Sequence, residues 1–572
     1  MRTKLQEIAL FWRRWRHLAA PFWRSSERNR TALLLGLAMA FNLINVALTV
    51  RLNEWSRDFF NALQDRNADA FFYQLTLLFA LAGTSLFLYA NQRYLCKKAV
   101  LIWREWMSAR YTERWLQTKT YYREIFHHRI DNPDQRIAED LRMFPSLTVT
   151  MVFDFVDSVG SLGAFAVILW GLSANYPVFG VVIPGMMLWL ALAFVIVGTW
   201  LVHLVGHPLV GLERLSQRYE ANYRHRLLRV REKAKEIAAY GGEACEERAI
   251  RERFGDVFAV WLKTILKERQ LNYFLQGYSQ ISGVVPYLIA APKYFSGAFQ
   301  MGELMQTMQA FNGVRVSLSW FILNYATLAD WKATVDRLTE FDAVLAERDA
   351  KSTMNVTVSA IDELRLENLR LDLPDGTVLA RIPHLVWAGG TRRALTGPSG
   401  IGKSTLLYAL RGMWPFGAGR VVLPSGRCLF LSQLPYLPEG NLCEVLAYPN
   451  ADMHVDAHLA AQVLRAVGLS ERIPEIRRTA RWEEILSPGE QQRLTLGRCW
   501  VHRPDWLFMD EALSAVDTAR RKTIMTKLAT DFPLLSVVSV VHDTTDTKWY
   551  DETVTWDSFA QVSPRQEATR DD

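Results

Sequence analysis

The chain has 572 residues, of which 50% are hydrophobic and 12% aromatic, with a net charge of +7 and a pI near 9.0. This length exceeds one ordinary folding core and this composition is heavy for a soluble protein, so we expect a membrane component. The basic residues cluster beside apolar segments, which favours a membrane surface over a nucleic-acid partner, and five scattered cysteines indicate neither a disulfide framework nor a zinc site.

Residues 1–30 predict a short helix rather than a cleavable signal peptide, because FWRRWRHLAAPFW has no uninterrupted apolar core and no small-residue cleavage site. Phe11, Trp15, Leu18 and Phe22 follow helical spacing, while the arginines fall elsewhere on the helical wheel. We expect this helix to lie in the membrane interface, where Trp and Arg suit the headgroup layer. A soluble amphipathic helix is the alternative.

Six apolar segments follow as candidate membrane spans. A bilayer core of about 30 Å needs roughly 20 apolar helical residues, a length that four segments meet plainly. The last two are diluted by polar residues and pass only if one face avoids lipid. The predicted spans lie near 31–50, 71–90, 147–170, 178–205, 271–292 and 304–328, within a transmembrane domain at 31–345.

The basic residues of the connections orient these spans. The connection 171–177 has no Lys or Arg and 292–303 has only Lys293, whereas 91–146 and 206–270 are long and strongly basic. We therefore predict that the two long connections are cytoplasmic and extend the helices of the bundle into the cytosol.

A polar run, NPDQRIAED at 132–140, lies in the first long connection and has the pattern of a helix start. Asn132 can cap a helix, Pro133 suits the first helical position, and Asp134 and Gln135 fall in the first turn, where orphan N–H groups want acceptors. We therefore predict a capped helix on the cytoplasmic side.

Three charged residues lie within the predicted spans. Asp154 and Asp157 are three residues apart in the third span, hence on one helix face, and Arg315 lies in the sixth. Facing a hydrated cavity, they would select a hydrophilic or cationic cargo. Alternatively, they pair between helices as packing contacts or lie close enough to the interface to escape the hydrocarbon.

After a polar linker at 346–355, the alternation of IDELRLENLRLDL begins a second domain at 356–561, followed by a polar tail at 562–572. Its centre is GPSGIGKS, between an apolar strand and a helix, which is the pattern of a phosphate-binding (Walker A) loop. Backbone N–H groups close around phosphate there, Lys403 reaches the β- and γ-phosphates, and Ser404 can hold Mg²⁺. The predicted nucleotide-binding residues of this loop are Gly397, Pro398, Ser399, Gly400, Ile401, Gly402, Lys403, Ser404 and Thr405.

The apolar strand WLFMDE, at 506–511, ends in two carboxylates. After a phosphate-binding loop, this pattern predicts that Asp510 binds the metal shell and that Glu511 orients and polarises the attacking water. A pair of acidic residues that caps the next helix is the structural alternative.

Upstream of that strand, LSPGEQQR at 486–493 resembles the signature of the ABC-transporter family. Gln433 in LSQLPYLPEGNL is similar to the Q-loop, SAVD at 514–517 to the D-loop, and His542 in SVVHD to the switch histidine. The matches follow the family's order. The resemblance implies ATP hydrolysis with Mg²⁺, with Glu511, His542 and Gln433 catalytic, Gln433 also at the metal, and Ser487, Gly489, Glu490 and Asp517 on nucleotide.

The chain departs from the family pattern at two places. The signature has Pro488 and Glu490 where the family has Gly and Gln, which leaves Ser487 and the Gly489 N–H able to meet γ-phosphate. Leu373 stands where the family has an aromatic residue that stacks on adenine. Phosphate binding is therefore better supported than a preference for adenine.

The resemblance implies that the signature of one subunit completes the phosphate site of another, and this chain has one copy of each motif. We predict a homodimeric half-transporter in the lipid bilayer, without a nucleic-acid partner. Its fold class is an α-helical six-span transmembrane bundle of the ABC exporter type, followed by an α/β P-loop nucleotide-binding domain.

The run NPDQR, with LNEWSRDFFNAL, LIWREW and LSWFI, also resembles half-transporters of the peroxisomal acyl-CoA type and bacterial SbmA/BacA-related ATPases, and is most similar to the YddA-like bacterial group. This resemblance implies a bacterial inner membrane, a cytoplasmic ATPase and a bulky polar cargo such as a peptide or cobalamin-like molecule. A fatty acyl or acyl-CoA carrier and an ATP-gated channel are the alternatives. The predicted coupling residues are Asn132, Asp134, Gln135 and Arg136, and the alternative is a helix that only stabilises the bundle.

Overall fold

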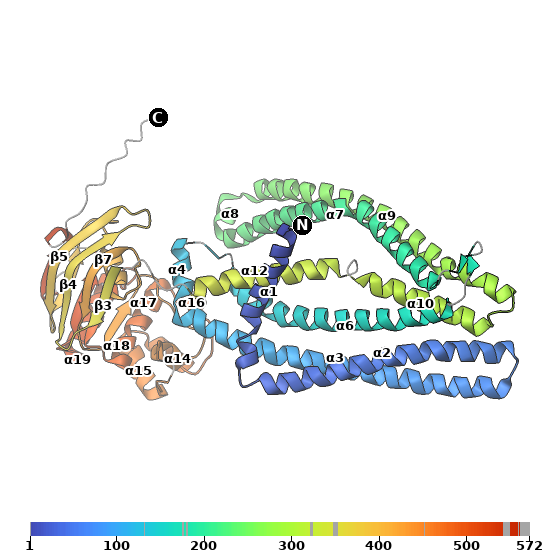
Figure 1. Ribbon diagram of the computed structural model, residues 1–572. Helices are drawn as coiled ribbons and strands as arrows, with labels where there is room; N and C mark the ends of the chain where they lie inside the picture. Colours follow the sequence, from blue (N-terminus) through green and yellow to red (C-terminus); the bar gives the residue numbers. More distant parts are fainter. Residues whose placement is uncertain are drawn as a thin grey trace. The chain divides into compact units, whose positions relative to one another are not determined.

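The computed structural model describes residues 2–127, 129–130, 132–173, 177–178, 181–182, 184–320, 324–346, 353–450, 452–541, 549–558 and 560. Contacts divide the chain into two compact units. The helical unit contains Met1–Gln117 and Ile130–Val344, and the α/β unit contains Thr118–Arg129 and Leu345–Asp572. Figure 1 shows long helices in the first unit and the sheets in the second.

The helical unit is built from long helices, because a chain in lipid must satisfy its backbone polar groups within each segment. Its elements are α1 (Arg2–Ala19), η1 (Phe22–Arg24), α2 (Arg28–Gln64), α3 (Ala68–Gln117), α5 (Pro133–Gln135), η2 (Arg136–Asp140), α6 (Leu141–Leu172), β1 (Pro177–Val178), β2 (Val181–Val182), α7 (Met186–Glu232), α8 (Ala234–Tyr240), α9 (Glu243–Phe295), α10 (Met301–Leu318) and α12 (Tyr325–Ala346).

Among the described residues, four helical stretches are long and apolar enough to cross a membrane: α2, α3, Pro133–Leu172 and α7. They contain the four strongest predicted spans. The weaker fifth segment lies in α9 and the sixth extends over α10 and α12, so the count of six spans stays a prediction.

Two predicted spans differ from the helices in their limits. The fourth begins as helix only at Met186, because Pro177–Val178 and Val181–Val182 pair as a short antiparallel ladder. In the sixth, α10 ends at Leu318, where the Ser319 hydroxyl donates to the carbonyl of Arg315 at 2.8 Å. The predicted span therefore extends over two separately bounded helices, since α12 begins at Tyr325.

Helix α1 is amphipathic as predicted, but its apolar face packs largely against protein. Leu18, near its end, and Phe22 of η1 are 2% and 0% exposed within the helical unit. Arg14 pairs with Asp336 of α12 at 2.6 Å, whereas Trp12 stays 49% exposed. Leu18 and Phe22 therefore pack against protein, and the position of this helix in the membrane interface stays a prediction.

The α/β unit combines a parallel five-stranded sheet, in the order β11-β6-β10-β9-β8, with a four-stranded sheet, in the order β3-β7-β4-β5. Its elements are α4 (Thr120–His127), β3 (Thr353–Val358), β4 (Glu363–Asp372), β5 (Val378–Ala388), β6 (Arg392–Thr396), α13 (Lys403–Leu410), β7 (Gly417–Leu423), β8 (Cys428–Leu431), α14 (Leu442–Ala447), α15 (Ala457–Ala466), η3 (Ser470–Glu475), α16 (Trp482–Ile485), α17 (Pro488–Leu496), α18 (Arg498–His502), β9 (Trp506–Asp510), α19 (Thr518–Asp531), β10 (Ser536–Val540), β11 (Glu552–Thr555) and η5 (Trp556–Ser558).

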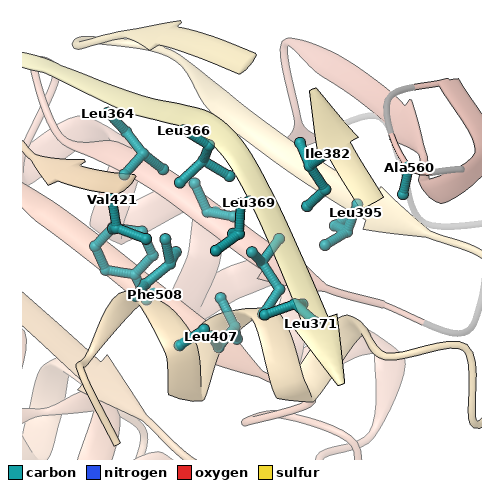
Figure 2. Close-up of a cluster of buried hydrophobic side chains, with 14 of the residues drawn as sticks. Leu364, Leu366, Leu369, Leu371, Ile382, Leu395, Leu407, Val421, Phe508 and Ala560 are labelled. Atoms are coloured by element: carbon teal, nitrogen blue, oxygen red, sulfur yellow. The ribbon is translucent and has the colours of Figure 1, made fainter. Parts of the chain in front are cut away.

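The core of the α/β unit lies around β4 and α13. The β4 leucines Leu364, Leu366, Leu369 and Leu371 are at most 1% exposed, and Figure 2 shows them in one cluster with Leu407 of α13. Their alternation shifts by one residue at a bulge between Glu367 and Arg370. The packing anchors α13, and with it the loop that precedes this helix.

Helix α4 comes from the first long basic connection, yet it belongs to the α/β unit. The ring of Phe126 meets Trp414 edge to face at a centroid distance of 5.3 Å and Phe416 at 5.6 Å. Edge-to-face aromatic pairs contribute stabilising energy beyond that of the apolar area they bury. The sequence reasoning placed coupling at residues 132–140 and missed this helix.

Candidate nucleotide site

The loop between β6 and α13 has the predicted phosphate-binding conformation. Gly400 and Gly402 have φ values of +77° and +109°, which side chains other than hydrogen rarely allow. A Cβ at Gly402 would lie 2.8 Å from Leu379 Cδ2, so this position has no room for a side chain. The backbone N–H groups of this loop and the N-terminus of α13 are suited to an anion.

Lys403 is held inside this loop. It is 5% exposed, and its Nζ donates to the carbonyl oxygens of Gly397 and Pro398, each at 2.7 Å. Burial lowers the pKa of Lys403, opposed by the carboxylates of Glu511 and Asp510. Phosphate oxygens are stronger acceptors than these carbonyls, so the ammonium is placed to pair with a nucleotide.

Ser404 and Asp510, the two residues predicted to hold the metal, lie in contact. The Ser404 hydroxyl donates to Asp510 Oδ1 at 2.7 Å, and Asp510 is 7% exposed at the end of β9. A hydroxyl and a carboxylate are the hard oxygen donors that Mg²⁺ prefers, alongside water and phosphate oxygens. These residues therefore fit Mg²⁺.

Glu511 follows Asp510 with a φ of +48°, a left-handed conformation that is uncommon for residues other than glycine. The Gln433 side chain donates to Glu511 Oε2 at 2.9 Å. The structure thus joins the predicted Q-loop residue to the predicted water-orienting carboxylate. His542, the predicted switch histidine, lies outside the described residues.

The signature residues start helix α17. Ser487 is the N-cap and forms a capping box with Glu490, whose Oε2 accepts from the Ser487 N–H at 2.9 Å and from its hydroxyl at 2.7 Å. Pro488 stands at the first helical position, where a proline loses no hydrogen bond. This departure from the family pattern therefore agrees with the local structure.

Glu490 remains a carboxylate where the family has an amide. Burial raises its pKa, but hydrogen bonds from Ser487 and the nearby Arg472 outweigh this effect and lower it. Arg472 Nη2 lies 3.5 Å from Glu490 Oε1. The Glu490 carboxylate therefore already has partners within its own chain, Ser487 and Arg472.

The D-loop is close to the signature. A Cβ at Gly489 would lie 2.6 Å from the carbonyl oxygen of Ala515, so the two segments touch through a glycine. The predicted nucleotide residue Asp517 caps α19 and accepts from the Arg520 N–H at 2.9 Å. Leu373 lies in the turn between β4 and β5, where its N–H donates to the Thr377 carbonyl at 2.8 Å.

The run 132–140 differs from the predicted capped helix. Asn132 has a φ of +51° and makes no side-chain capping bond, because a left-handed residue aims its side chain away from the helix N–H groups. Asp134 and Gln135 are exposed, and Gln135 donates to Glu139 at 3.0 Å. The segment then continues as the π-type turn η2.

The ion pairs of this run converge on Asp140, which sequence reasoning did not single out. Asp140 is 3% exposed and accepts from Arg136 at 3.1 Å and from Arg337 of α12 at 2.9 and 2.5 Å. The bidentate pair ties the base of α6 to α12.

The three charged residues of the predicted spans are Asp154, Asp157 and Arg315, and no hydrogen bond found among the described residues joins Arg315 to either aspartate. Asp154 and Asp157 are partly exposed on α6. Arg315 donates to Asn312, one turn earlier on α10, at 2.7 and 3.2 Å. The contact found for Arg315 is therefore within its own helix.

Two protein families match the chain. Residues 21–295 match the family described as ABC transporter transmembrane region 2, and residues 384–514 match the family described as ABC transporter. The chain is 33% identical over 535 residues to the inner membrane ABC transporter ATP-binding protein YddA of Escherichia coli, with 92% of this chain and 94% of that protein covered.

More distant relatives cover similar lengths. The lysosomal cobalamin transporter ABCD4 of Mus musculus is 22% identical, over 87% of this chain and 86% of its own. A solved structure of a bacterial Atm1-family ABC exporter with ATP bound superposes with a TM-score of 0.71 at 16% identity, covering 93% of this chain and 94% of that chain. The similarity in structure extends over both units.

Proposed function

The chain belongs to the ABC transporter family, with a membrane region fused to an ATP-hydrolysing domain, and from this premise we propose a homodimer that moves a bulky polar cargo across a bacterial inner membrane. Two observations support the proposal: Ser404 meets Asp510 and Gln433 meets Glu511 in the α/β unit, and the helical unit has charged residues within predicted spans. The α/β unit is cytoplasmic in this proposal.

In the proposed reaction, Lys403 and the N–H groups of the loop would hold the ATP phosphates, and Ser404 and Asp510 would hold Mg²⁺. The metal, when bound, neutralises charge on the phosphates. Glu511 accepts a proton from the attacking water, and the 2.9 Å contact from Gln433 aims its carboxylate. The strained backbone of Glu511 supports this role, since such strain is common at active sites.

The dimer is supported by an apolar surface that exposed side chains of α8 and α9 form on the helical unit. Its residues precede the predicted span 271–292 and belong to the connection 206–270, which is predicted to be cytoplasmic. Several large apolar side chains exposed on one cytosolic segment mark an interaction site, and a second copy of the chain is the partner that one set of ATPase motifs requires. Its residues include Tyr240 at 89%, Phe254 at 50%, Phe258 at 61%, Trp261 at 58%, Leu262 at 49% and Ile265 at 53% exposure.

The polarity of the cargo is inferred from α10. Phe311 and Val314 face the bundle, at 1% and 0% exposure, whereas Asn312 is exposed and Arg315 partly exposed. A charged side chain in a span is costly against lipid, so this face is expected to line water. Asp154 and Asp157 would add carboxylates to that path, and the cobalamin transporter among the relatives is named for a bulky polar cargo.

The run 132–140 is proposed to couple the two activities through Asn132, Asp134, Gln135 and Arg136. The support is that Asp140 locks this segment to Arg337 of α12, the helix that precedes the α/β unit in the chain. Asp134→Ala combined with Arg136→Ala should spare ATP binding and lower the cargo moved per ATP. An unchanged ratio would make the segment architectural.

Uptake into sealed proteoliposomes tests the proposal, with labelled peptides, cobalamin and acyl-CoA compared between the wild type and Glu511→Gln. ATP-dependent movement of a peptide or cobalamin that Arg315→Leu reduces would support it. Acyl-CoA movement that Arg315→Leu leaves unchanged would favour the lipid-like alternative. An ATP-induced conductance that persists in Glu511→Gln would identify a channel instead.

A further inference from the structure

Gln492 connects three of the functional motifs within one chain. It lies on α17, near the end of the signature run 486–493, and is 4% exposed. Its Nε2 donates to the Gln433 carbonyl at 3.1 Å and to the Ser514 hydroxyl at 3.2 Å. Its Oε1 accepts from the Ala515 N–H at 2.8 Å. Both hydrogens of the amide and its oxygen are therefore used.

The hydrogen-bond partners of Gln492 belong to loops that themselves contact predicted residues of the ATP site. Gln433 contacts the Glu511 carboxylate through its own side chain at 2.9 Å. Ser514 and Ala515 belong to the D-loop, and Ala515 also touches Gly489 of the signature. The Q-loop, the D-loop and the start of α17 are thus held as one block by a single buried amide.

We propose that Gln492 is a positioning residue through which the two ATP sites of the dimer act together, an inference that rests on the homodimer proposed above. In that dimer, Gln433 and Glu511 act on the nucleotide held by their own chain. Ser487, Gly489 and the D-loop act on the nucleotide of the partner. Gln492 is bonded to both groups, so a change at one site reaches the other through this side chain.

Loss of the Gln492 amide is expected to disturb the Q-loop and the D-loop. Gln492→Met keeps the volume of the side chain but removes the bonds that the buried amide makes to the Ala515 N–H and the Gln433 carbonyl, so the two loops lose their shared attachment. The apolar anchors of α17, Leu494 and Leu496, are fully buried and stay in place. The expected damage is therefore a loss of alignment, not of the fold.

Gln491 provides a matched control on the same helix. Its Nε2 likewise donates to two acceptors, the backbone carbonyls of Glu483 at 2.8 Å and Leu486 at 2.9 Å, and these belong to neither the Q-loop nor the D-loop. Gln491→Met therefore removes the same chemical group and a similar number of bonds. Ser514→Ala is a milder variant that removes one acceptor of Gln492.

The test measures ATP hydrolysis by the full-length protein in proteoliposomes. For Gln492→Met we expect a kcat about tenfold lower with a KM for ATP within about twofold, since the residue does not contact the phosphate-binding loop. Ser514→Ala should lose about two- to threefold in kcat. Gln491→Met should match the wild type.

Mixed dimers of one wild-type and one Gln492→Met chain, purified through two different tags, separate a positioning role from a local defect. Coupled sites predict a rate close to that of the variant homodimer. A rate midway between the two homodimers, or a wild-type kcat for Gln492→Met, would overturn the inference. If Gln492→Met does not fold, the same comparison with Ser514→Ala decides. Failure of the two tags to copurify, with full hydrolysis by monomers, would instead overturn the homodimer itself.

Discussion

The packing of α4 in the α/β unit makes a quantitative prediction about coupling. Phe126 contacts Trp414 and Phe416 edge to face, at 5.3 and 5.6 Å. Aromatic pairs of this kind are each worth about 0.5–1.5 kcal/mol beyond their buried area. Phe126→Ala should therefore weaken the attachment of α4 by about 2 kcal/mol, roughly a 30-fold change in the attached population.

The assay is the amount of cargo moved per ATP hydrolysed in proteoliposomes. Since α4 follows α3 after two residues and packs on the α/β core, loosening it should leave basal hydrolysis nearly intact while the ratio falls. Ile125→Ala is the matched control, because Ile125 is the preceding residue and is 59% exposed.

A double variant with Trp414→Ala checks that the effect comes from this contact. If the two substitutions act on one interaction, their effects on the ratio should not add. The reasoning is refuted if Phe126→Ala keeps the wild-type ratio, or if Ile125→Ala lowers it equally.

Three further predictions concern the site and the helical unit. Glu511→Gln should retain ATP binding and lose about 100-fold or more in phosphate release, because the general base is gone; release at the wild-type rate would contradict its role. Asp510→Asn should raise the Mg²⁺ concentration needed for half-maximal hydrolysis, as measured by titration, whereas an unchanged value would place the metal elsewhere. Burial raises the pKa of Asp342 on α12, but bonds from Arg114 and His17 outweigh this and lower it below 3.8. Its stabilising effect is thus present above pH 3.8 and lost as the pH falls through the lower folded-state pKa, so thermal melts of Asp342→Asn should converge on the wild type only in strong acid.

The elements that sequence reasoning predicted well are those whose signal is local. The phosphate-binding loop, the carboxylate strand and the four strongest spans each depend on residues adjacent in the chain or related by a short period. The capping prediction at Asn132 was local too, but it was wrong because the backbone there is left-handed. The turn leads into a segment whose ion pairs reach Arg337, so tertiary contacts override the local preference.

Motif chemistry and apolar periodicity were thus enough to identify the family of this protein and the parts of its ATP site, because both are written in short stretches of chain. Folding alone decided which side chains meet across long separations: Asp140 with Arg337, 197 residues apart, and Gln492 with Gln433, 59 residues apart. Such contacts have no periodic signature, since they depend on how helices and loops pack in three dimensions. Which amides and ion pairs are buried, and with which partners, is decided only when that packing has removed them from water.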